Sequence, residues 1–108
     1  MANIRIALLR VEKRKEHYFV LSEKDVIGME RSLTTNEFET SIQTKLKIER
    51  KVLVVSFLYR GEKFVRIGET YYKVERTYDL GQYIELYLAN TSLTEAEFIY
   101  EIRASKDK

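Results

Sequence analysis

The sequence predicts a mainly β domain of the α+β type: a small barrel or sandwich of about six to eight short antiparallel strands with one packed α-helix. Two observations predict this class. Strand-like runs recur every 8 to 12 residues or so and are separated by turn-forming residues, which is typical of small barrels and sandwiches. Only one stretch, residues 35–46, has a clear helical period. The 108 residues leave room for a single core.

A hairpin is expected at the start of the chain. Apolar residues that alternate with polar or small ones indicate a half-buried strand reaching about residue 12 (Ile4, Ile6 and Leu8). The charged run over residues 13–16 would form the hairpin tip, and residues 17–21 would form the return arm.

Polar and charged residues at 22–25 predict a turn after that arm. Residues 26–33 would then resume as a strand. Gly28 lies inside this strand and indicates either a β-bulge or the close approach of another backbone, since glycine weakens a regular strand.

The predicted helix has both a start signal and an apolar stripe. Thr34 and Glu37 fit a capping box, in which each side chain satisfies a backbone N–H at the helix start. One face then carries an apolar residue every fourth position (Phe38, Ile42 and Leu46). A helix this short has to be held by packing that stripe onto a sheet.

Residues 51–59 are apolar at neighbouring positions, which predicts a central strand covered on both faces, with the helix as the cover of one. Arg60 and Gly61 would turn the chain into a strand over residues 62–67. The pair Gly68-Glu69 suits a two-residue hairpin turn with glycine at positive φ.

Two more strands follow in the same pattern. Residues 71–76 alternate, residues 79–81 make the third turn, and Ile84, Leu86 and Leu88 form the last core face opposite Glu85 and Tyr87.

The end of the chain allows two interpretations. Ser92 and Glu95 could cap a terminal helix, whereas alternating apolar residues around Phe98 favour an extra strand, which is the preferred interpretation. We therefore expect a domain over residues 1–91 and a C-terminal extension over residues 92–108 that is disordered at its end.

Composition excludes several function classes. The chain has no cysteine and one histidine, so thiolate and multi-histidine metal sites are excluded. No pair of carboxylates, serine motif or glycine loop is spaced for catalysis or phosphate binding, so no catalytic, cofactor-binding or metal residue is predicted. No run is long and apolar enough for a membrane span, no signal peptide is recognisable, and a cytoplasmic origin is expected.

The net charge of +2 is low for a nucleic-acid-binding domain. Two basic clusters could touch DNA phosphates or an acidic partner (Lys13, Arg14 and Lys15; Lys45, Lys47, Arg50 and Lys51). The preferred interpretation is structural: the first cluster is a hairpin tip, and the second is a helix C-terminus, where cations complement the helix dipole. Five of the eight tyrosines could stack bases on a sheet, but packing or subunit contact is preferred (Tyr71, Tyr72, Tyr78, Tyr83 and Tyr87).

Several fragments occur in a characteristic order. Residues 26–38 read VIGMERSLTTNEF, with Ser32, Glu37 and Phe38 at the matching places, and Leu46-Lys47 follows at the end of the helix. Three further fragments come after it: Tyr59-Arg60-Gly61-Glu62, Tyr72-x-Val74-x-Arg76-Thr77-Tyr78 and Ile84-Glu85-Leu86-Tyr87.

In their order and spacing, these fragments resemble tailed-bacteriophage head closure proteins, the head–tail connectors or stoppers, over about residues 3–91. Two departures are clear. Lys15, Glu16 and His17 stand where the family has a glycine-asparagine tip, and the chain continues past the closing strand. The matched residues make the fold, so no catalytic or binding site is carried over.

The resemblance implies a non-enzymatic virion protein that forms a homo-oligomeric ring at the phage neck, after assembly in the bacterial cytoplasm. Its partners would be the portal or adaptor ring, the tail terminator or tail tube protein, and the double-stranded DNA passing through the channel, with no membrane and no cofactor. Exposed loops are expected to make the contacts (Lys13, Arg14, Lys15, Arg60, Glu62, Asp79 and Gln82). Two alternatives stay open: a tail-completion or tail-terminator ring subunit, and an OB-like or SH3-like nucleic-acid-binding barrel.

Overall fold

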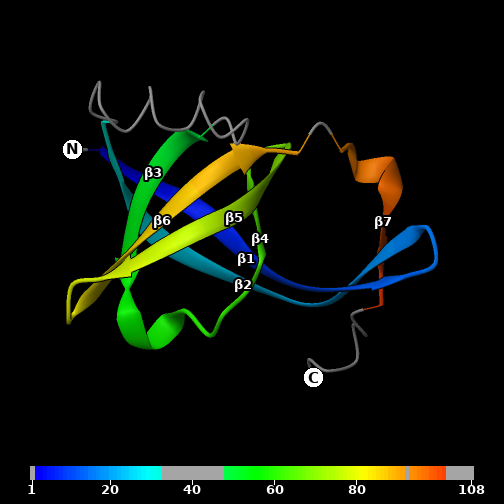
Figure 1. Cartoon of the computed structure of the whole chain (residues 1–108), viewed down its shortest axis with the longest axis horizontal. Helices are drawn as coiled ribbons and strands as arrows, with labels where there is room; N and C mark the ends of the chain where they lie inside the picture. The colour runs from blue at the N-terminus through cyan, green and yellow to red at the C-terminus, as the bar shows by residue number, and fades with distance from the viewer. Residues whose placement is uncertain (1, 33–47, 92, 102–108) are drawn as a thin grey trace.

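The computed structural model describes residues 2–32, 48–91 and 93–101, and this part of the chain is mainly β, as predicted (Figure 1). One sheet contains seven strands: β1 (Ala2–Arg14), β2 (His17–Arg31), β3 (Ile48–Val55), β4 (Phe64–Ile67), β5 (Thr70–Asp79), β6 (Tyr83–Asn90) and β7 (Phe98–Tyr100). Two short 3-10 turns, η1 (Ser56–Leu58) and η2 (Glu95–Glu97), precede β4 and β7. The predicted helix at 35–46 lies outside the described residues.

The sheet closes on itself into a barrel. Its order is β1-β4-β5-β6-β3-β2, and β1 also pairs with β2, so six strands form a continuous antiparallel ring. β7 lies outside that ring and pairs with β2 in the parallel direction. Two details of the prediction are therefore wrong: one strand is parallel, and β1 and β2 are long, with 13 and 15 residues.

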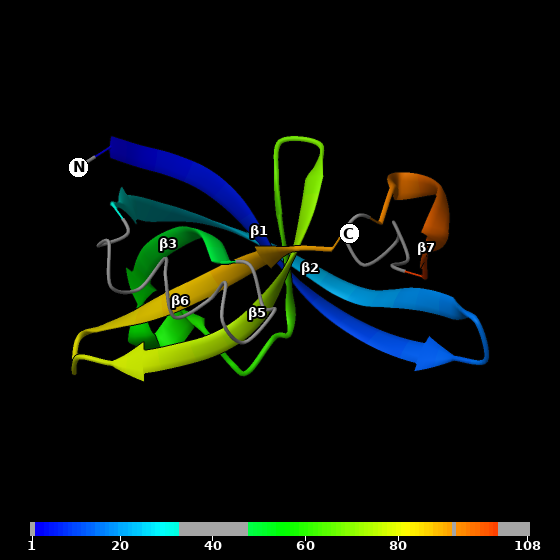
Figure 2. The same cartoon turned by 45° about the horizontal axis from the view of Figure 1, so that its top comes forward.

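Two seams of the barrel are short. β1 meets β4 only over residues 7–9 and 64–66, and β2 meets β3 only over residues 29–31 and 51–53. β1 and β2 pair along their whole length, and β5 pairs with β6 as far as residue 79. As a result, the β1–β2 and β5–β6 hairpins extend beyond the barrel in opposite directions (Figures 1 and 2).

The turn expected at residues 22–25 does not exist, because β2 runs straight through them. Leu21 is instead an extra residue in the ladder, since Arg10 pairs with Ser22 and Val11 with Val20. Such a bulge bends a strand without ending it. The polar residues after the bulge have partners, because Glu23 accepts a hydrogen bond from Arg66 and Lys24 donates one to the carbonyl of Leu58.

Two apolar cores share β1. The first fills the barrel (Ile6, Leu8, Val26, Val52, Val54, Val65, Tyr72, Leu86 and Leu88). The second lies under β7 (Ala7, Leu9, Val20, Tyr71 and Phe98). Successive residues of a strand point to opposite faces, so β1 supplies both cores and is buried on both sides at residues 6–9.

β3 is buried on both faces, as predicted, but it spans Ile48–Val55 rather than residues 51–59. It ends where the backbone N–H of Ser56 donates to the carbonyl of Gln82, which directs the chain into η1. The outer face of β6 is also covered, since Glu85 and Tyr87 are each only 7% exposed.

The expected glycine roles are confirmed at two positions. Gly68 has φ 63° and begins the two-residue turn between β4 and β5. Gly28 pairs regularly with Ile4, so it marks a close approach and not a bulge. A Cβ atom at Gly28 would lie 3.2 Å from the carbonyl oxygen of Leu53.

The preferred strand near the C-terminus is present as β7. A capping box does precede it, but Thr94 and Glu97 form that box around the short turn η2. Ser92, the expected cap, lies outside the described residues. Phe98 packs in the second core, so β7 belongs to the same packed body as the barrel.

Candidate interaction surfaces

The predicted contact residues fall into two groups at opposite ends of a molecule whose longest extent is 45 Å (Figure 1). One group is the exposed tip of the β1–β2 hairpin (Lys13, Arg14 and Lys15). The other lies on the loops around η1 and on the β5–β6 turn (Arg60, Glu62, Asp79 and Gln82). The second group lies on the β5–β6 turn and on the loop after η1, and Ser56 joins η1 to that turn. We call this region the turn end, and it lies away from the hairpin tip (Figure 1).

Hydrogen bonds fix the β5–β6 turn to η1. The Ser56 hydroxyl donates to the carbonyl of Gly81 at 2.6 Å, and the Ser56 N–H donates to the carbonyl of Gln82 at 2.8 Å. Within the turn, Asp79 Oδ1 accepts from the N–H of Gly81 at 2.8 Å. Asp79 therefore stabilises the turn, whereas Gln82 is exposed and contributes its backbone to the joint.

Glu62 is 9% exposed and acts inside its loop. Its Oε1 accepts from the N–H of Arg60 at 2.7 Å, and its Oε2 lies 3.9 Å from Nζ of Lys24. The hydroxyl of Tyr59 donates to the carbonyl of Glu62 at 2.6 Å. Burial, together with the nearby Glu62 carboxylate, raises the pKa of Tyr59 to about 12. Glu62 thus positions the loop that presents the exposed Arg60.

Apolar side chains are exposed at the turn end. We define the turn patch as Phe57, Leu80 and Tyr83, which are 76%, 47% and 37% exposed. A hollow of about 430 Å³ lies beside it, between residues 55–57 and 81–83. The sequence did not predict this patch, because Phe57 sits inside an apolar run that was interpreted as a buried strand.

A second exposed apolar surface lies on β7. We define the β7 patch as Ile99 and Tyr100, which are 38% and 37% exposed. The Tyr100 hydroxyl accepts from Nη1 of Arg66 at 2.9 Å and lies 2.7 Å from the hydroxyl of Tyr71. Burial and the hydrogen bond with Tyr100 raise the pKa of Tyr71. Tyr100 is therefore held in one orientation.

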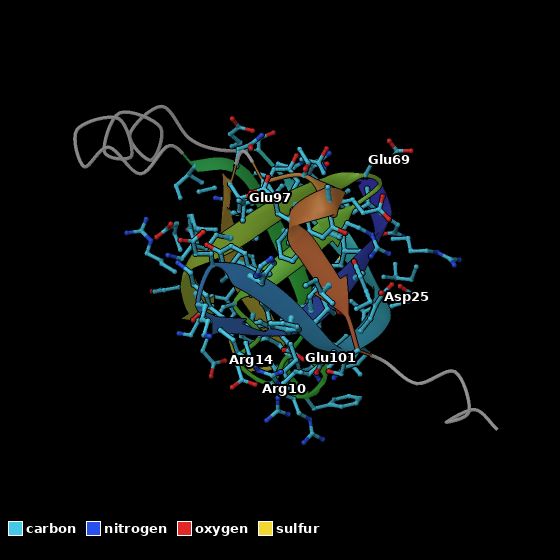
Figure 3. All side chains as sticks on the ribbon, turned by 90° about the vertical axis from the view of Figure 1, so that its right-hand side faces the viewer. Arg10, Arg14, Asp25, Glu69, Glu97 and Glu101 are labelled. Carbon is cyan, nitrogen blue, oxygen red and sulfur yellow. The ribbon has the colours of Figure 1, made fainter. Side chains whose placement is uncertain are left out.

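Carboxylates surround the β7 patch. A hollow of about 340 Å³ next to it is lined by Arg66, Gly68, Glu69, Tyr71, Glu95 and Tyr100. Figure 3 shows Glu69 and Glu97 in the upper half of this end of the molecule, and Arg10 and Arg14 in the lower half. This end is therefore acidic around η2 and basic along the hairpin.

The basic tip is tied to the segment after β7. Nη2 of Arg14 lies 2.9 Å from Oε1 of Glu12, and its Nη1 lies 3.3 Å from Oε2 of Glu101. The Arg14 guanidinium also lies 4.6 Å from the centre of the Phe19 ring. Lys13 lies 5.4 Å from the centre of the Tyr18 ring. Exposed ion pairs of this kind stabilise little, so the tip remains available for contacts.

The second basic cluster is not at a helix end. Arg50 and Lys51 lie in β3, while Lys45 and Lys47 lie outside the described residues. Arg50 forms two hydrogen bonds to the Glu30 carboxylate, at 2.8 and 3.0 Å. Lys51 is 6% exposed, and its Nζ lies 5.6 Å from the centre of the Tyr87 ring. Arg50 and Lys51 therefore make contacts within the sheet.

Three of the five tyrosines considered for base stacking are buried (Tyr71, Tyr72 and Tyr87). The Tyr71 ring stacks on Phe98 with 4.2 Å between centroids and 12° between planes. Tyr78 and Tyr83 are exposed, at 61% and 37%. The packing interpretation is confirmed for the three buried rings.

Neither a metal centre nor a spanning helix is found in the described part of the chain. No three histidine, cysteine, aspartate or glutamate side chains gather there in a way that would hold a metal ion. Across residues 2–32, 48–91 and 93–101, no helix is long and apolar enough to cross a membrane. His17 is exposed at the hairpin tip.

Comparisons with protein-family models, with curated proteins and with solved structures found no match to this chain. The surfaces described above are therefore interpreted from their own geometry and chemistry.

Proposed function

We propose that this chain is a structural virion protein that forms a ring at the neck of a tailed bacteriophage, between the portal or adaptor and the tail. In this role it closes the DNA-filled head and offers the docking surface for the tail. The order of the sequence fragments described above suggests the role, and the observation that carries it in the structure is the pair of different surfaces at opposite ends of one small barrel.

A ring subunit needs two different surfaces for its neighbours. Contacts between unlike surfaces join copies head to tail, and they close into a ring when the rotation allows it. The turn end and the β7 side, by which we mean the β7 patch with the hollow next to it, supply such a pair of surfaces toward the two ends of the 45 Å axis (Figure 1). Many modest contacts made at once then give a stable assembly.

The pairing of charges on the barrel supports a channel through which DNA passes without adhering. Arg31, Arg50 and Arg66 each form an ion pair with a carboxylate, at 3.0, 2.8 and 2.7 Å. Each unpaired cation that touches a phosphate would add a salt-dependent retaining force. These three arginines are neutralised by their partners, so they add less to the force that would retain DNA.

Electron microscopy of particles from a producing strain that lacks this gene tests the proposal. We expect finished tails beside tailless heads that have packaged and lost their DNA. Heads without any tails in the preparation would place the protein in tail completion instead. Normal particles would refute both roles, and a strain carrying the restored gene is the control.

A further inference from the structure

The turn end carries an arginine that is held in place but has no acidic partner. Arg60 is exposed, and its side chain forms no ion pair within the described residues. Its backbone is fixed by Glu62, which in turn is held by Tyr59. Beside it, the Lys24 ammonium donates to the carbonyl of Leu58 at 2.6 Å, so the loop is attached to β2 as well. A side chain presented by a fixed loop loses less freedom when it binds.

The hollow beside β7 contains carboxylates that have no cationic partner within the part of the chain that the structure describes. Glu69 and Glu95 line it, and neither forms an ion pair among the described residues. Arg66 is the cation in the same hollow, but it bonds to Glu23 at 2.7 Å and to the Tyr100 hydroxyl. Covering this hollow would remove carboxylates from water, which is costly without a cation.

From this complementarity we propose that the turn end of one copy docks onto the β7 side of the next copy, with Arg60 between Glu69 and Glu95. The turn patch of the first copy would then cover the β7 patch of the second. An arginine suits this place because its planar fork binds carboxylates through two hydrogen bonds and packs on aromatic rings such as Tyr100.

Three observations identify a second copy as the partner. Each surface has an exposed apolar centre. The turn end presents Arg60 without an ion pair to any described residue, and the β7 hollow contains Glu69 and Glu95 beside Arg66, which is paired with Glu23. The one acidic side chain inside the β5–β6 turn, Asp79, is already bonded to Gly81 and does not neutralise Arg60. The two surfaces lie too far apart for a single barrel to join them, so the contact runs between copies and in one direction (Figure 1).

This contact deepens the proposed function, on which its role in a ring rests, and it uses none of the basic residues Lys13, Arg14 and Lys15 of the hairpin tip, which lies next to β7. The tip then stays free for the portal-side or tail-side partner. A contact between unlike surfaces also predicts chains or rings rather than closed pairs.

Cysteine cross-linking tests the contact directly, because the chain has no cysteine of its own. Leu80→Cys places a thiol in the turn patch, and Ile99→Cys places one in the β7 patch. The purified variants are treated with a short bis-maleimide, alone and mixed, at up to about 1 mM protein. We expect cross-linked dimers in the mixture. The cross-linking yield of either variant alone should not exceed that of the exposed control Asn3→Cys.

The other outcomes overturn the contact. Efficient cross-linking of Leu80→Cys with itself would show that like surfaces meet. Cross-linking no stronger than that of the Asn3→Cys control in every sample would show that these patches do not join copies. Neither result affects the neck role, which the particle phenotype tests separately.

A charge exchange locates Arg60. In the mixed assay, Arg60→Glu is expected to lower the cross-linking yield about tenfold, and so is the double change Glu69→Arg with Glu95→Arg. All three changes in one chain should restore most of the yield, since each surface again meets its opposite. If the variants keep the circular dichroism of the original chain but the triple change does not restore the cross-linking yield, the placement of Arg60 between Glu69 and Glu95 is wrong.

Discussion

At Gly28 the backbones of neighbouring strands come so close that a single methyl group decides the packing. A Cβ atom there would lie 3.2 Å from a carbonyl oxygen of Leu53 and 3.5 Å from side-chain atoms of Ile6 and Val54. The carbonyl belongs to β3, which is buried on both faces and cannot shift freely.

We therefore expect Gly28→Ala to lower the free energy of unfolding by about 1 to 3 kcal/mol, as overpacking does, despite the smaller backbone entropy of alanine in the unfolded chain. Urea unfolding measures the change. Ile27→Val, at an exposed neighbouring position, is the control and should change stability by less than about 0.5 kcal/mol. An alanine variant as stable as the original would mean that β2 and β3 separate easily.

Tyr59 gives a second prediction at this scale. Its pKa is about 12 in the folded chain and about 10 when unfolded. Between these values the folded chain keeps a proton that the unfolded chain has lost, so ionisation favours unfolding. The stability that Tyr59 contributes is complete below about pH 10 and disappears as the pH rises toward about 12.

Urea unfolding from about pH 9 to about pH 12 should therefore show a shallower loss of stability for Tyr59→Phe than for the original chain. The variant should also be weaker at neutral pH by about 1 kcal/mol, because the hydrogen bond to the Glu62 carbonyl is lost. Tyr78→Phe, an exposed control, should follow the original curve. Identical slopes for all three proteins would contradict the prediction.

Single residues were predicted well where their role is local. Gly28 and Gly68 follow from what glycine alone tolerates, and the structure confirms both. Glu62 and Asp79 were placed on contact loops, yet their carboxylates bond to the backbone of those loops. Turn-forming residues in a sequence indicate that a loop exists. Whether a carboxylate on that loop faces solvent depends on which backbone N–H groups lie within hydrogen-bond distance, and only the structure shows this.

Among the elements, β7 depends most on one side chain. It has three residues, and Phe98 is the one that is buried. The Phe98 ring lies against Tyr18, Phe64 and Tyr71, with centroids 5.5, 5.7 and 4.2 Å away. β7 is thus attached by an aromatic cluster more than by its short ladder.

Phe98→Ala should lower the free energy of unfolding by about 3 to 5 kcal/mol, since it leaves a cavity between the long hairpin and the barrel. Chemical denaturation measures the loss. The matched control is Ile99→Ala, the next residue along β7 but exposed, which should cost less than about 1 kcal/mol. Equal effects of the two changes would mean that the aromatic cluster does not hold β7.

The hairpin tip carries a prediction about partners. Reversing the charge of Lys13, Arg14 and Lys15 should leave folding intact, because all three are exposed and the ion pairs of Arg14 stabilise little. In a producing strain the same changes should reduce tail joining, scored as the ratio of tailed particles to free heads. Unchanged joining and ring assembly would remove the tip from the contact surface.

Element prediction succeeded where periodicity was clean and failed where a bulge intervened. The polar run after Leu21 looks like a turn in sequence, but the bulge there keeps β2 continuous and its charged residues find partners across the sheet. The parallel pairing of β7 with β2 depends on a contact between distant parts of the chain, which no local pattern reveals.

At the scale of the whole molecule, the fold class was predictable, with a barrel as one of its two forms, but the order of the strands was not. Alternation defines which faces are buried, but the order β1-β4-β5-β6-β3-β2 depends on pairings between residues far apart in sequence. The turn and β7 patches were missed for the same reason, since Phe57 in η1 and Ile99 in β7 become surface features only once these elements are placed against the barrel.

The net charge and the buried tyrosines give a prediction about nucleic acid. We expect only weak binding to single-stranded oligonucleotides at low salt, without base preference and lost at physiological ionic strength. Fluorescence anisotropy over a salt series measures it, with a scrambled-base oligonucleotide as the control. Micromolar or tighter binding that depends on the bases would favour a nucleic-acid-binding barrel over the neck role.

The two short seams have a consequence for how the molecule moves. They divide the ring into the β1–β2 hairpin and the β3–β6–β5–β4 unit. The β1–β2, β3–β6 and β5–β6 ladders are much longer than the seams, whereas β4–β5 covers only residues 64–67 and 70–73. Local opening begins where the fewest hydrogen bonds hold the structure together. The two halves should therefore separate at the two seams before either half unfolds. Amide hydrogens at residues 7–9 and 29–31 that bond across the seams would then exchange with solvent sooner than those inside the ladders of each half. In the ring that we propose, a subunit that opens in this way could change its curvature while each half keeps its own shape.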